Sequence, residues 1–363
     1  MAVFDLTDPR RLLPCSESNS GYQGDRIRGE VILIATGSYP YRPPNFPFHD
    51  PRVYDSDTIL TLHEIPSRML VFGGGVIGCE YACMLAALGI QVSVVEKETR
   101  LNSFLDGEIS EALRAQMEGA GIRMLMPDTV ESIDDKEVIE VRLKSGTTLE
   151  VETILVSAGR CGNTAALALD RIGIAVTARG RLTVNEHFQT SIPHIYAAGD
   201  VLGFPALASS AMDQARIAMA HAFNSNYRAG LPKILPYGLY TIPECSMAGE
   251  TEESLKEKDI PYVVGRGAYE DNVRGQIIGD IKGFLKLIFQ DDDEMRLLGV
   301  HMIGEQATEL IHIGLMVLQM EKGRDLLMGT CYNYPTLAEV YKEATFDAVA
   351  GWTLKRGGAY SPT

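Results

Sequence analysis

Short apolar runs that end at glycine recur along the first two hundred residues of the chain. Residues 30–38 read EVILIATGS, in which an unbroken apolar run leads into a glycine turn. A run of this kind is typical of a strand that is buried on both faces of a parallel sheet. It predicts a central strand over 30–36, and the same pattern predicts strands over 69–72 and 91–95.

The segment ETILVSAGR, residues 152–160, repeats the pattern of EVILIATGS at a spacing of 122 residues. Both segments begin with Glu, pass through Ile-Leu and reach a glycine at the same position. HIYAAGDVLG, residues 194–203, again ends a short apolar strand at Ala-Gly and then adds Asp200. The recurrence of one strand-and-turn unit favours a duplicated nucleotide-binding domain, and therefore the α/β class.

Residues 68–100 carry the most informative chemistry in the sequence. The strand at 69–72 is followed by Gly73, Gly75 and Gly78 in a G-x-G-x-x-G pattern, and then by an apolar helix. The first glycine permits a tight turn, the second lets a pyrophosphate approach the backbone, and the third lets helix and strand pack closely. Free N–H groups at the start of the helix favour phosphate. The combination predicts a dinucleotide-binding site.

Glu96 stands at the tip of the strand predicted over 91–95. A carboxylate in this place accepts hydrogen bonds from ribose hydroxyls and repels a 2′-phosphate, which favours NAD(H). Lys97 and Arg100 lie close in sequence and would soften that preference, so NADP(H) stays open as a second nucleotide.

The remaining pattern predicts a helix over 101–120 with Asp106 as its N-cap, and a short helix over 58–63. After about residue 235 the sequence pattern changes to short strand-like runs separated by glycine or acidic turns. This pattern indicates an antiparallel sheet in an α+β domain. The expected strands cover 261–269, 276–280, 283–290 and 296–303, and the expected helices cover 305–322 and 336–349.

Composition narrows the function classes. The formal net charge of −15 argues against a nucleic-acid partner and against an anionic membrane surface. No apolar run of 18 residues is free of charge and no leader pattern is present, so we expect a cytoplasmic protein that does not cross a membrane.

None of the six cysteines forms a CxxC pair or a zinc-like cluster, so no metal is expected. Cys79 and Cys83 share a helix face, which suits buried thiols better than a working dithiol.

Several motifs together resemble one family. GGGVIGCEYA, SAGR, HIYAAGD and NYPTLAE are similar to the flavin-dependent pyridine nucleotide–disulfide oxidoreductases, over about residues 28 to 350. RVYDSDTIL, YTIPECS and ATELIHIG resemble the transhydrogenase branch of that family. The resemblance implies tandem Rossmann-like FAD and NAD(P) domains and an α+β dimerisation domain. The implied boundaries are 1–58 and 185–232 for the FAD domain, 59–184 for the NAD(P) domain and 233–363 for the dimerisation domain.

The resemblance also assigns cofactor residues by position. Asp200 read alone suits a helix cap, whereas the resemblance makes it a ligand of the flavin's ribitol or pyrophosphate region. The NAD(P) set is Gly73, Gly74, Gly75, Val76, Ile77, Gly78, Cys79, Glu80, Glu96 and Gly159. The FAD set is Thr36, Gly37, Asp200 and Ala208.

The implied activity is hydride transfer between NADPH and NAD⁺ through FAD, in a homodimer formed by the C-terminal domain. The family's disulfide reductases place His before the proline of the C-terminal motif, and this chain has Tyr334. Tyrosine titrates near pH ~10 and is a poor proton shuttle for thiols, but hydride transfer needs no shuttle. We therefore nominate no catalytic side chain, and a reductase similar to lipoamide dehydrogenase is disfavoured.

The family's first G-x-G-x-x-G and its CxxxxC site would precede the strand at 30–36, and neither is in this sequence. FAD binding is therefore the expectation most open to failure. The alternative is an N-terminally truncated, non-catalytic fragment that keeps nucleotide-binding and dimerisation domains.

Overall fold

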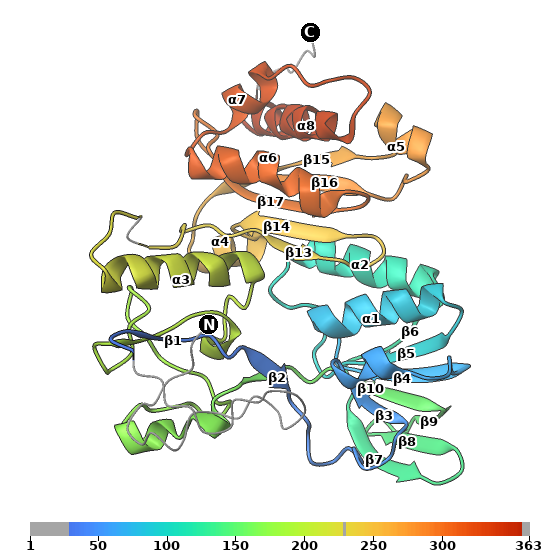
Figure 1. Cartoon of the computed structure of the whole chain (residues 1–363). Helices are drawn as coiled ribbons and strands as arrows, with labels where there is room; N and C mark the ends of the chain where they lie inside the picture. The colour runs from blue at the N-terminus through green and yellow to red at the C-terminus, as the bar shows by residue number, and fades with distance from the viewer. Residues whose placement is uncertain (1–28, 228–229, 358–363) are drawn as a thin grey trace. The chain divides into compact units, whose positions relative to one another are not determined.

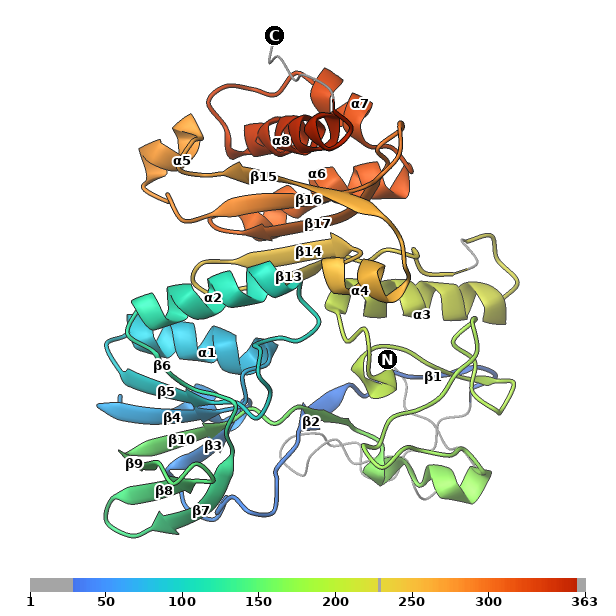
Figure 2. The same ribbon diagram turned by 180° about the vertical axis from the view of Figure 1, so that it is seen from behind.

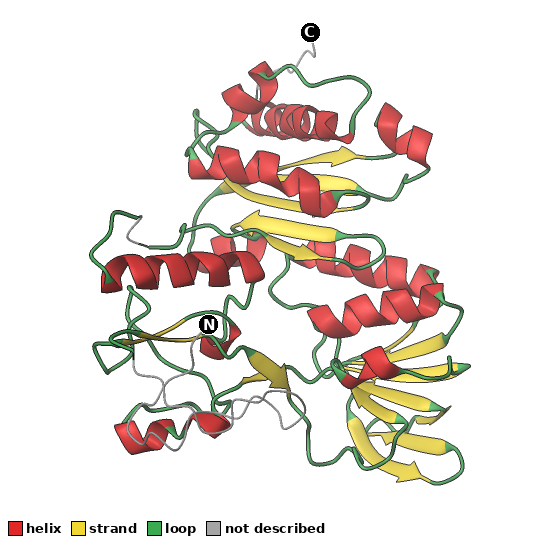
Figure 3. Ribbon diagram, in the orientation of Figure 1, coloured by secondary structure: helices red, strands yellow, loops and turns green. Residues whose placement is uncertain are grey.

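The structure is a computed structural model that describes residues 29–227 and 230–357. The chain divides into two compact units, whose elements are labelled in Figure 1 and coloured by type in Figure 3. The smaller unit holds residues Met1–Tyr41 and Ala158–Pro232, and the larger unit holds Arg42–Ser157 and Lys233–Thr363. The domain boundaries predicted from the sequence remain a prediction.

The smaller unit brings two of the related sequence segments together. β1 (Ile32–Ile34) pairs in parallel with β12 (Ile195–Ala197), so the strand predicted over 30–36 is confirmed in a shorter form. β2 (Ser38–Pro40) pairs antiparallel with β11 (Arg160–Gly162). Short 3₁₀ turns and helix α3 (Ala208–Ala222) complete this unit. Its buried apolar core contains Ile32, Ile34, Leu169, Ile174, Leu182, Ile195, Ala197 and Val201.

The larger unit contains a parallel sheet with the strand order β3-β10-β4-β5-β6. Helices α1 and α2 lie on the same side of this sheet in both views (Figures 1 and 2). Their apolar faces pack against the strands, which explains why the strands read as unbroken apolar runs. The bounds are Val53–Asp55 (β3), Thr153–Val156 (β10), Arg68–Phe72 (β4), Gln91–Val95 (β5), Arg123–Leu125 (β6), Val76–Ala87 (α1) and Gly107–Gly119 (α2). A small antiparallel sheet adds β7 (Val130–Asp135), β8 (Ile139–Leu143) and β9 (Thr148–Val151).

The C-terminal part of the larger unit is an antiparallel sheet with the order β13-β14-β17-β16-β15. Helix α6 (Ala307–Gln319) packs on β14 and β17, and α8 (Val340–Lys355) packs on β15 and β16. The strands are Tyr237–Leu239 (β13), Cys245–Gly249 (β14), Tyr262–Ala268 (β15), Phe284–Gln290 (β16) and Leu297–Ile303 (β17). The shorter helices are Glu252–Glu257 (α4), Val273–Ile278 (α5) and Arg324–Gly329 (α7).

Two sequence expectations about elements were wrong. Residues 276–280 do not form a strand, because Asn272 caps a short helix by accepting from the Gly275 N–H and Gly279 ends it in the left-handed region. The helix expected over 101–120 begins only at Gly107, where the Asp106 carboxylate accepts from the Glu108 N–H. Asp106 is therefore the N-cap, as predicted, and the residues before it form a loop.

Within the described residues, no helix combines the length and apolar character that crossing a membrane requires.

Candidate nucleotide site

The turn between β4 and α1 has the geometry that its glycines predict. Gly73 has a φ of +107°, which favours glycine. At Gly78 an added Cβ would lie 1.8 Å from the Gly73 carbonyl oxygen, so helix and turn approach too closely for any side chain. A Cβ at Gly75 would meet nothing within 4 Å, and this residue is exposed. Gly75 is also the N-cap of α1, and no side chain caps the helix there. The free N–H groups and the open space fit a pyrophosphate.

Glu96 closes one side of this turn. Its Oε2 accepts from the Gly74 N–H at 2.6 Å and its Oε1 accepts from the Glu98 N–H at 2.8 Å. These two bonds fix the carboxylate against the turn at the carboxyl end of β5. A carboxylate has about four acceptor positions, so each oxygen keeps capacity for a donor such as a ribose hydroxyl.

The first residues of α1 differ in their surroundings. Val76 and Ile77 are half-buried, and Cys79 is fully buried. Glu80 Oε1 accepts from the Tyr240 N–H at 2.8 Å, and burial raises the pKa of this carboxyl. Burial also raises the pKa of the thiols of Cys79 and Cys83, which makes both poor nucleophiles and argues against a working dithiol.

Asn102 is a neighbour of the turn that the sequence analysis did not single out. Its backbone N–H donates to the Gly74 carbonyl at 3.2 Å, and its Nδ2 donates to Cys79 Sγ at 3.4 Å. Its φ of +43° is one that asparagine tolerates better than most residues. An asparagine in a loop was the one available signal, and it is a weak one.

In the smaller unit, three of the predicted FAD residues follow two paired strands: Thr36 and Gly37 come after β1, and Asp200 comes after β12. Thr36 Oγ1 is buried and has no hydrogen-bond partner among the described residues. Gly37 has a φ of +71°, and a Cβ added there would meet nothing within 4 Å. An unpaired buried hydroxyl beside an open glycine fits a polar ligand at this turn. Ala208 is exposed and begins α3.

Asp200 is held by a short polar chain. The Ser38 hydroxyl donates to Asp200 Oδ2 at 3.0 Å, and Arg160 Nε donates to the Ser38 Oγ at 2.7 Å. Leu207, not Asp200, is the N-cap of α3, so Asp200 does not cap that helix. Ser38 and Arg160 were missed as site residues, although both lie inside the repeated strand-and-turn segments.

Gly159, with a φ of +89°, accepts through its carbonyl from the Tyr41 N–H at 2.9 Å.

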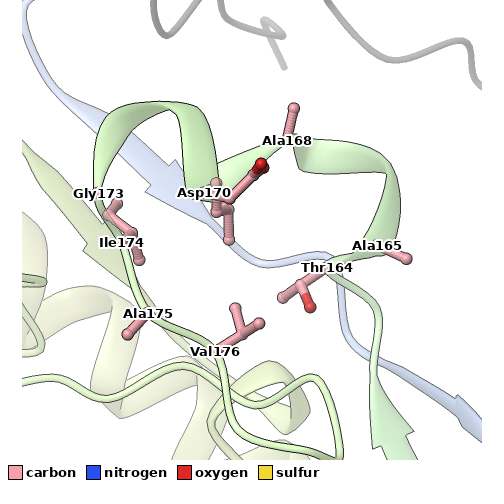
Figure 4. Close-up of a pocket in the computed structure, with 9 residues that line it drawn as sticks. Thr164, Ala165, Ala168, Asp170, Gly173, Ile174, Ala175 and Val176 are labelled. Carbon is pink, nitrogen blue, oxygen red and sulfur yellow. The ribbon is translucent and has the colours of Figure 1, made fainter.

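Figure 4 shows a separate hollow of the smaller unit, lined mainly by small and apolar side chains between Thr164 and Val176. None of the residues predicted to bind a cofactor lines it. It therefore adds nothing to the nucleotide site.

Comparison with known proteins places this geometry in a family. The family model described as pyridine nucleotide-disulphide oxidoreductase matches residues 8–215. The model for the dimerisation domain of the same family matches residues 235–345.

Proteins named soluble pyridine nucleotide transhydrogenase are similar to the chain over most of its length. The protein from Mycobacterium tuberculosis is 43% identical over 343 residues, which cover 94% of this chain and 72% of that protein. The one from Chromohalobacter salexigens is 42% identical over 324 residues, with 88% and 69% covered. The one from an Enterobacter species is 42% identical over 330 residues, with 90% and 70% covered.

Solved structures agree with these matches. The HOCl-induced flavoprotein disulfide reductase RclA from Escherichia coli is similar with a TM-score of 0.84 and 28% identity, covering 89% of this chain and 75% of that one. LpdA from Mycobacterium tuberculosis gives a TM-score of 0.79 and 27% identity, with 87% and 69% covered.

These matches confirm the resemblance carried by the sequence motifs and the predicted fold class, Rossmann-like α/β units followed by an α+β domain. They also confirm the predicted cofactors, because enzymes of this family use FAD together with NAD(H) or NADP(H). The chain belongs to the pyridine nucleotide-disulphide oxidoreductase family.

Proposed function

We propose that this chain is an NAD(P)⁺ transhydrogenase that transfers hydride between NADPH and NAD⁺ by way of FAD. The observation that carries the proposal is the open turn at Gly75, closed on one side by Glu96, in a chain whose relatives of 42–43% identity are named transhydrogenases. FAD, when bound, supplies the reversible acceptance of hydride.

The side chains of this protein bind and orient. Residues Gly73 to Glu80 would hold the pyrophosphate of the nicotinamide nucleotide, and Glu96 would accept from its adenosine ribose. Gly159 would lie by its nicotinamide half. Holding the two reactants in one geometry lowers the barrier by removing the entropy cost of bringing them together.

The same proposal assigns a contact with FAD to each of the residues predicted to bind it. Thr36 would use its unpaired hydroxyl, Gly37 would let the flavin approach the backbone, and Ala208 would lie near the ring. Asp200, fixed by Ser38, would accept from a hydroxyl of the ribitol.

No side chain is proposed as acid or base. Tyr334 is 69% exposed, and hydride transfer needs no proton at that position. The free cysteines among the described residues are buried except Cys331, so no pair is exposed for disulfide chemistry.

We also propose a homodimer formed through residues 233–363 and a cytoplasmic location. The match of residues 235–345 to a dimerisation domain supports the first.

Stopped-flow absorbance tests the activity. NADPH should bleach the visible absorbance of FAD bound to the purified chain, and NAD⁺ added afterwards should restore it. Failure of NADPH to bleach the bound flavin would overturn the proposal. The control is Cys331→Ser, which should behave like the wild type; a loss of transfer in this variant would favour thiol chemistry instead.

A further inference from the structure

The loop of residues 97–106 lies between the proposed ribose acid and the start of α2. Its inner side contacts the phosphate-binding turn, because Asn102 donates to the Gly74 carbonyl at 3.2 Å. A Cβ added at Gly74 would lie 2.6 Å from Leu101 Cδ2 and 3.0 Å from Glu96 Cβ. The 97–106 loop and Glu96 are therefore packed against the same residue of the turn.

The outer side of the 97–106 loop is held by the C-terminal domain. Arg100 Nη1 donates to Glu253 Oε1 at 2.6 Å, and the same oxygen accepts from the Gly107 N–H at 3.0 Å. Arg100 also donates to the carbonyls of Ser103 and Leu105, at 2.8 and 3.2 Å. Glu253 thus fixes both the middle and the end of the loop through a single arginine and a backbone amide.

Lys286 makes the second set of contacts with the 97–106 loop. It projects from β16, and its side chain is 1% exposed. Its Nζ lies 2.7 Å from Asp106 Oδ1, 3.0 Å from Glu108 Oε2 and 2.5 Å from Glu252 Oε1. The three carboxylates have oxygens within 4.8 Å of one another, and the ammonium of Lys286 lies within ion-pair distance of all three. Asp106 is the last residue of the loop and the N-cap of α2.

An ion cluster built around a buried pair, Lys286 and Asp106, is an expensive way to stabilise a fold. Removing charges from water costs about as much as their attraction returns, so well-packed apolar residues would serve stability as well. The charges instead add positional specificity, because each hydrogen-bonded ion pair fixes the position of a particular atom. In this cluster, the fixed atoms belong to the loop that packs against Glu96 and Gly74.

We propose that Lys286 and Glu253 are positioning residues for the nucleotide site. Through Asp106 and Arg100 they hold the 97–106 loop, so the C-terminal domain sets how well Glu96 and the turn bind a nicotinamide nucleotide. The inference rests on the proposed function only in assuming that this turn binds such a nucleotide.

The test measures the affinity for NADH by fluorescence titration of the full chain with FAD, and steady-state kinetics alongside. Glu253→Gln keeps the shape and one acceptor while removing the charge, and Lys286→Met removes the buried ammonium. We expect NADH to bind about tenfold more weakly in each variant, with KM raised and kcat within about twofold of the wild type. Because Lys286→Met leaves the buried carboxylate of Asp106 without its cation and is at risk of misfolding, Glu253→Gln by itself is sufficient for the test.

Two controls separate positioning from stability. Lys258→Met removes an exposed ion pair with Glu250 that does not touch the loop, and it should bind NADH normally. Leu318→Ala opens the buried core of the C-terminal domain and lowers stability without changing the contacts of the loop. Unchanged NADH affinity in Glu253→Gln, or an equal loss in Leu318→Ala, would overturn the inference. If the wild type itself does not bind NADH, the proposed function fails instead.

Discussion

Gly75 and Gly78 stand three residues apart in one turn, yet a methyl group added to each would meet different surroundings. At Gly78 the methyl carbon would lie 1.8 Å from a backbone oxygen, and at Gly75 it would enter open space. The space beside Gly78 is filled by the protein itself. The space beside Gly75 is the one into which the proposed pyrophosphate fits.

Gly78→Ala should therefore lower both the stability and the affinity for nucleotides, with a loss of about 3 kcal/mol in the free energy of unfolding. Gly75→Ala should weaken NADH binding by tenfold or more, roughly 1.4 kcal/mol, and leave the unfolding midpoint unchanged. Urea denaturation and NADH titration of both variants provide the measurement. Equal effects of the two substitutions on binding and on stability would contradict this assignment.

At the same scale, we propose that Glu96 influences the choice between NADH and NADPH. Glu96→Gln keeps an oxygen for the turn but removes the negative charge that would repel a 2′-phosphate. We expect the ratio of NADPH to NADH affinity to rise by about fivefold to tenfold, which corresponds to ~1 kcal/mol for one exposed charge pair. Titrating the variant with each nucleotide measures this ratio, and an unchanged ratio would show that Glu96 does not face the ribose.

At the scale of elements, short helices depend on their caps. Helix α4 has only six residues, and it begins with a capping box in which Thr251 and Ser254 each accept from the other's backbone N–H. The cap also affects contacts outside α4. Glu252 of this helix pairs with Lys286, and Glu253 pairs with Arg100 of the 97–106 loop.

Thr251→Ala should lower the free energy of unfolding by about 1 kcal/mol, the usual value of an N-cap side chain. Urea denaturation is the measurement. Thr61→Ala is a suitable control, since its exposed hydroxyl bonds only within a 3₁₀ turn and should contribute little. A loss in Thr251→Ala no larger than in the control would mean that the capping box does not stabilise α4.

At the scale of the whole molecule, the acidic cluster around Lys286 makes the larger unit sensitive to pH. Burial acts to raise the pKa of Asp106, Glu108 and Glu252, but neighbouring cations and hydrogen bonds outweigh it and leave each pKa below its ordinary value. For Lys286, burial acts to lower the pKa, and the carboxylates outweigh it and raise the pKa.

A lowered carboxyl pKa gives stability that is present above the ordinary value, near pH ~4, and is lost as pH falls through the folded-state value. The free energy of unfolding of the wild type should therefore decrease as the pH falls below about 4. In Lys286→Met this decrease should be smaller, because Asp106, Glu108 and Glu252 each lose a cation that favours the charged form, although Arg266 and Lys256 still pair with the two glutamates. Urea denaturation at a series of pH values measures both slopes, and parallel slopes would contradict the electrostatic role of Lys286.

Local patterns in the sequence determined the parts of the site that depend on neighbouring residues. The glycines of the 73–78 turn, the acid at the tip of β5 and the cap at Asp106 were all predictable, because spacing along the chain fixes their backbone geometry. The same reasoning failed for α5, where an apolar run suits a strand or a helix equally and the cap at Asn272, directly before the helix, decides between them.

Tertiary structure alone decided what meets across long separations in sequence. Lys286 is the one charged residue in the mainly apolar strand FLKLIFQ, and nothing near it predicts that it pairs with Asp106, 180 residues away. Ser38, Arg160 and Asp200 likewise form a chain only because β1 pairs with β12 and β2 with β11. A sequence period reports which face of an element is buried, whereas the partner on that face is chosen by the packing of whole elements.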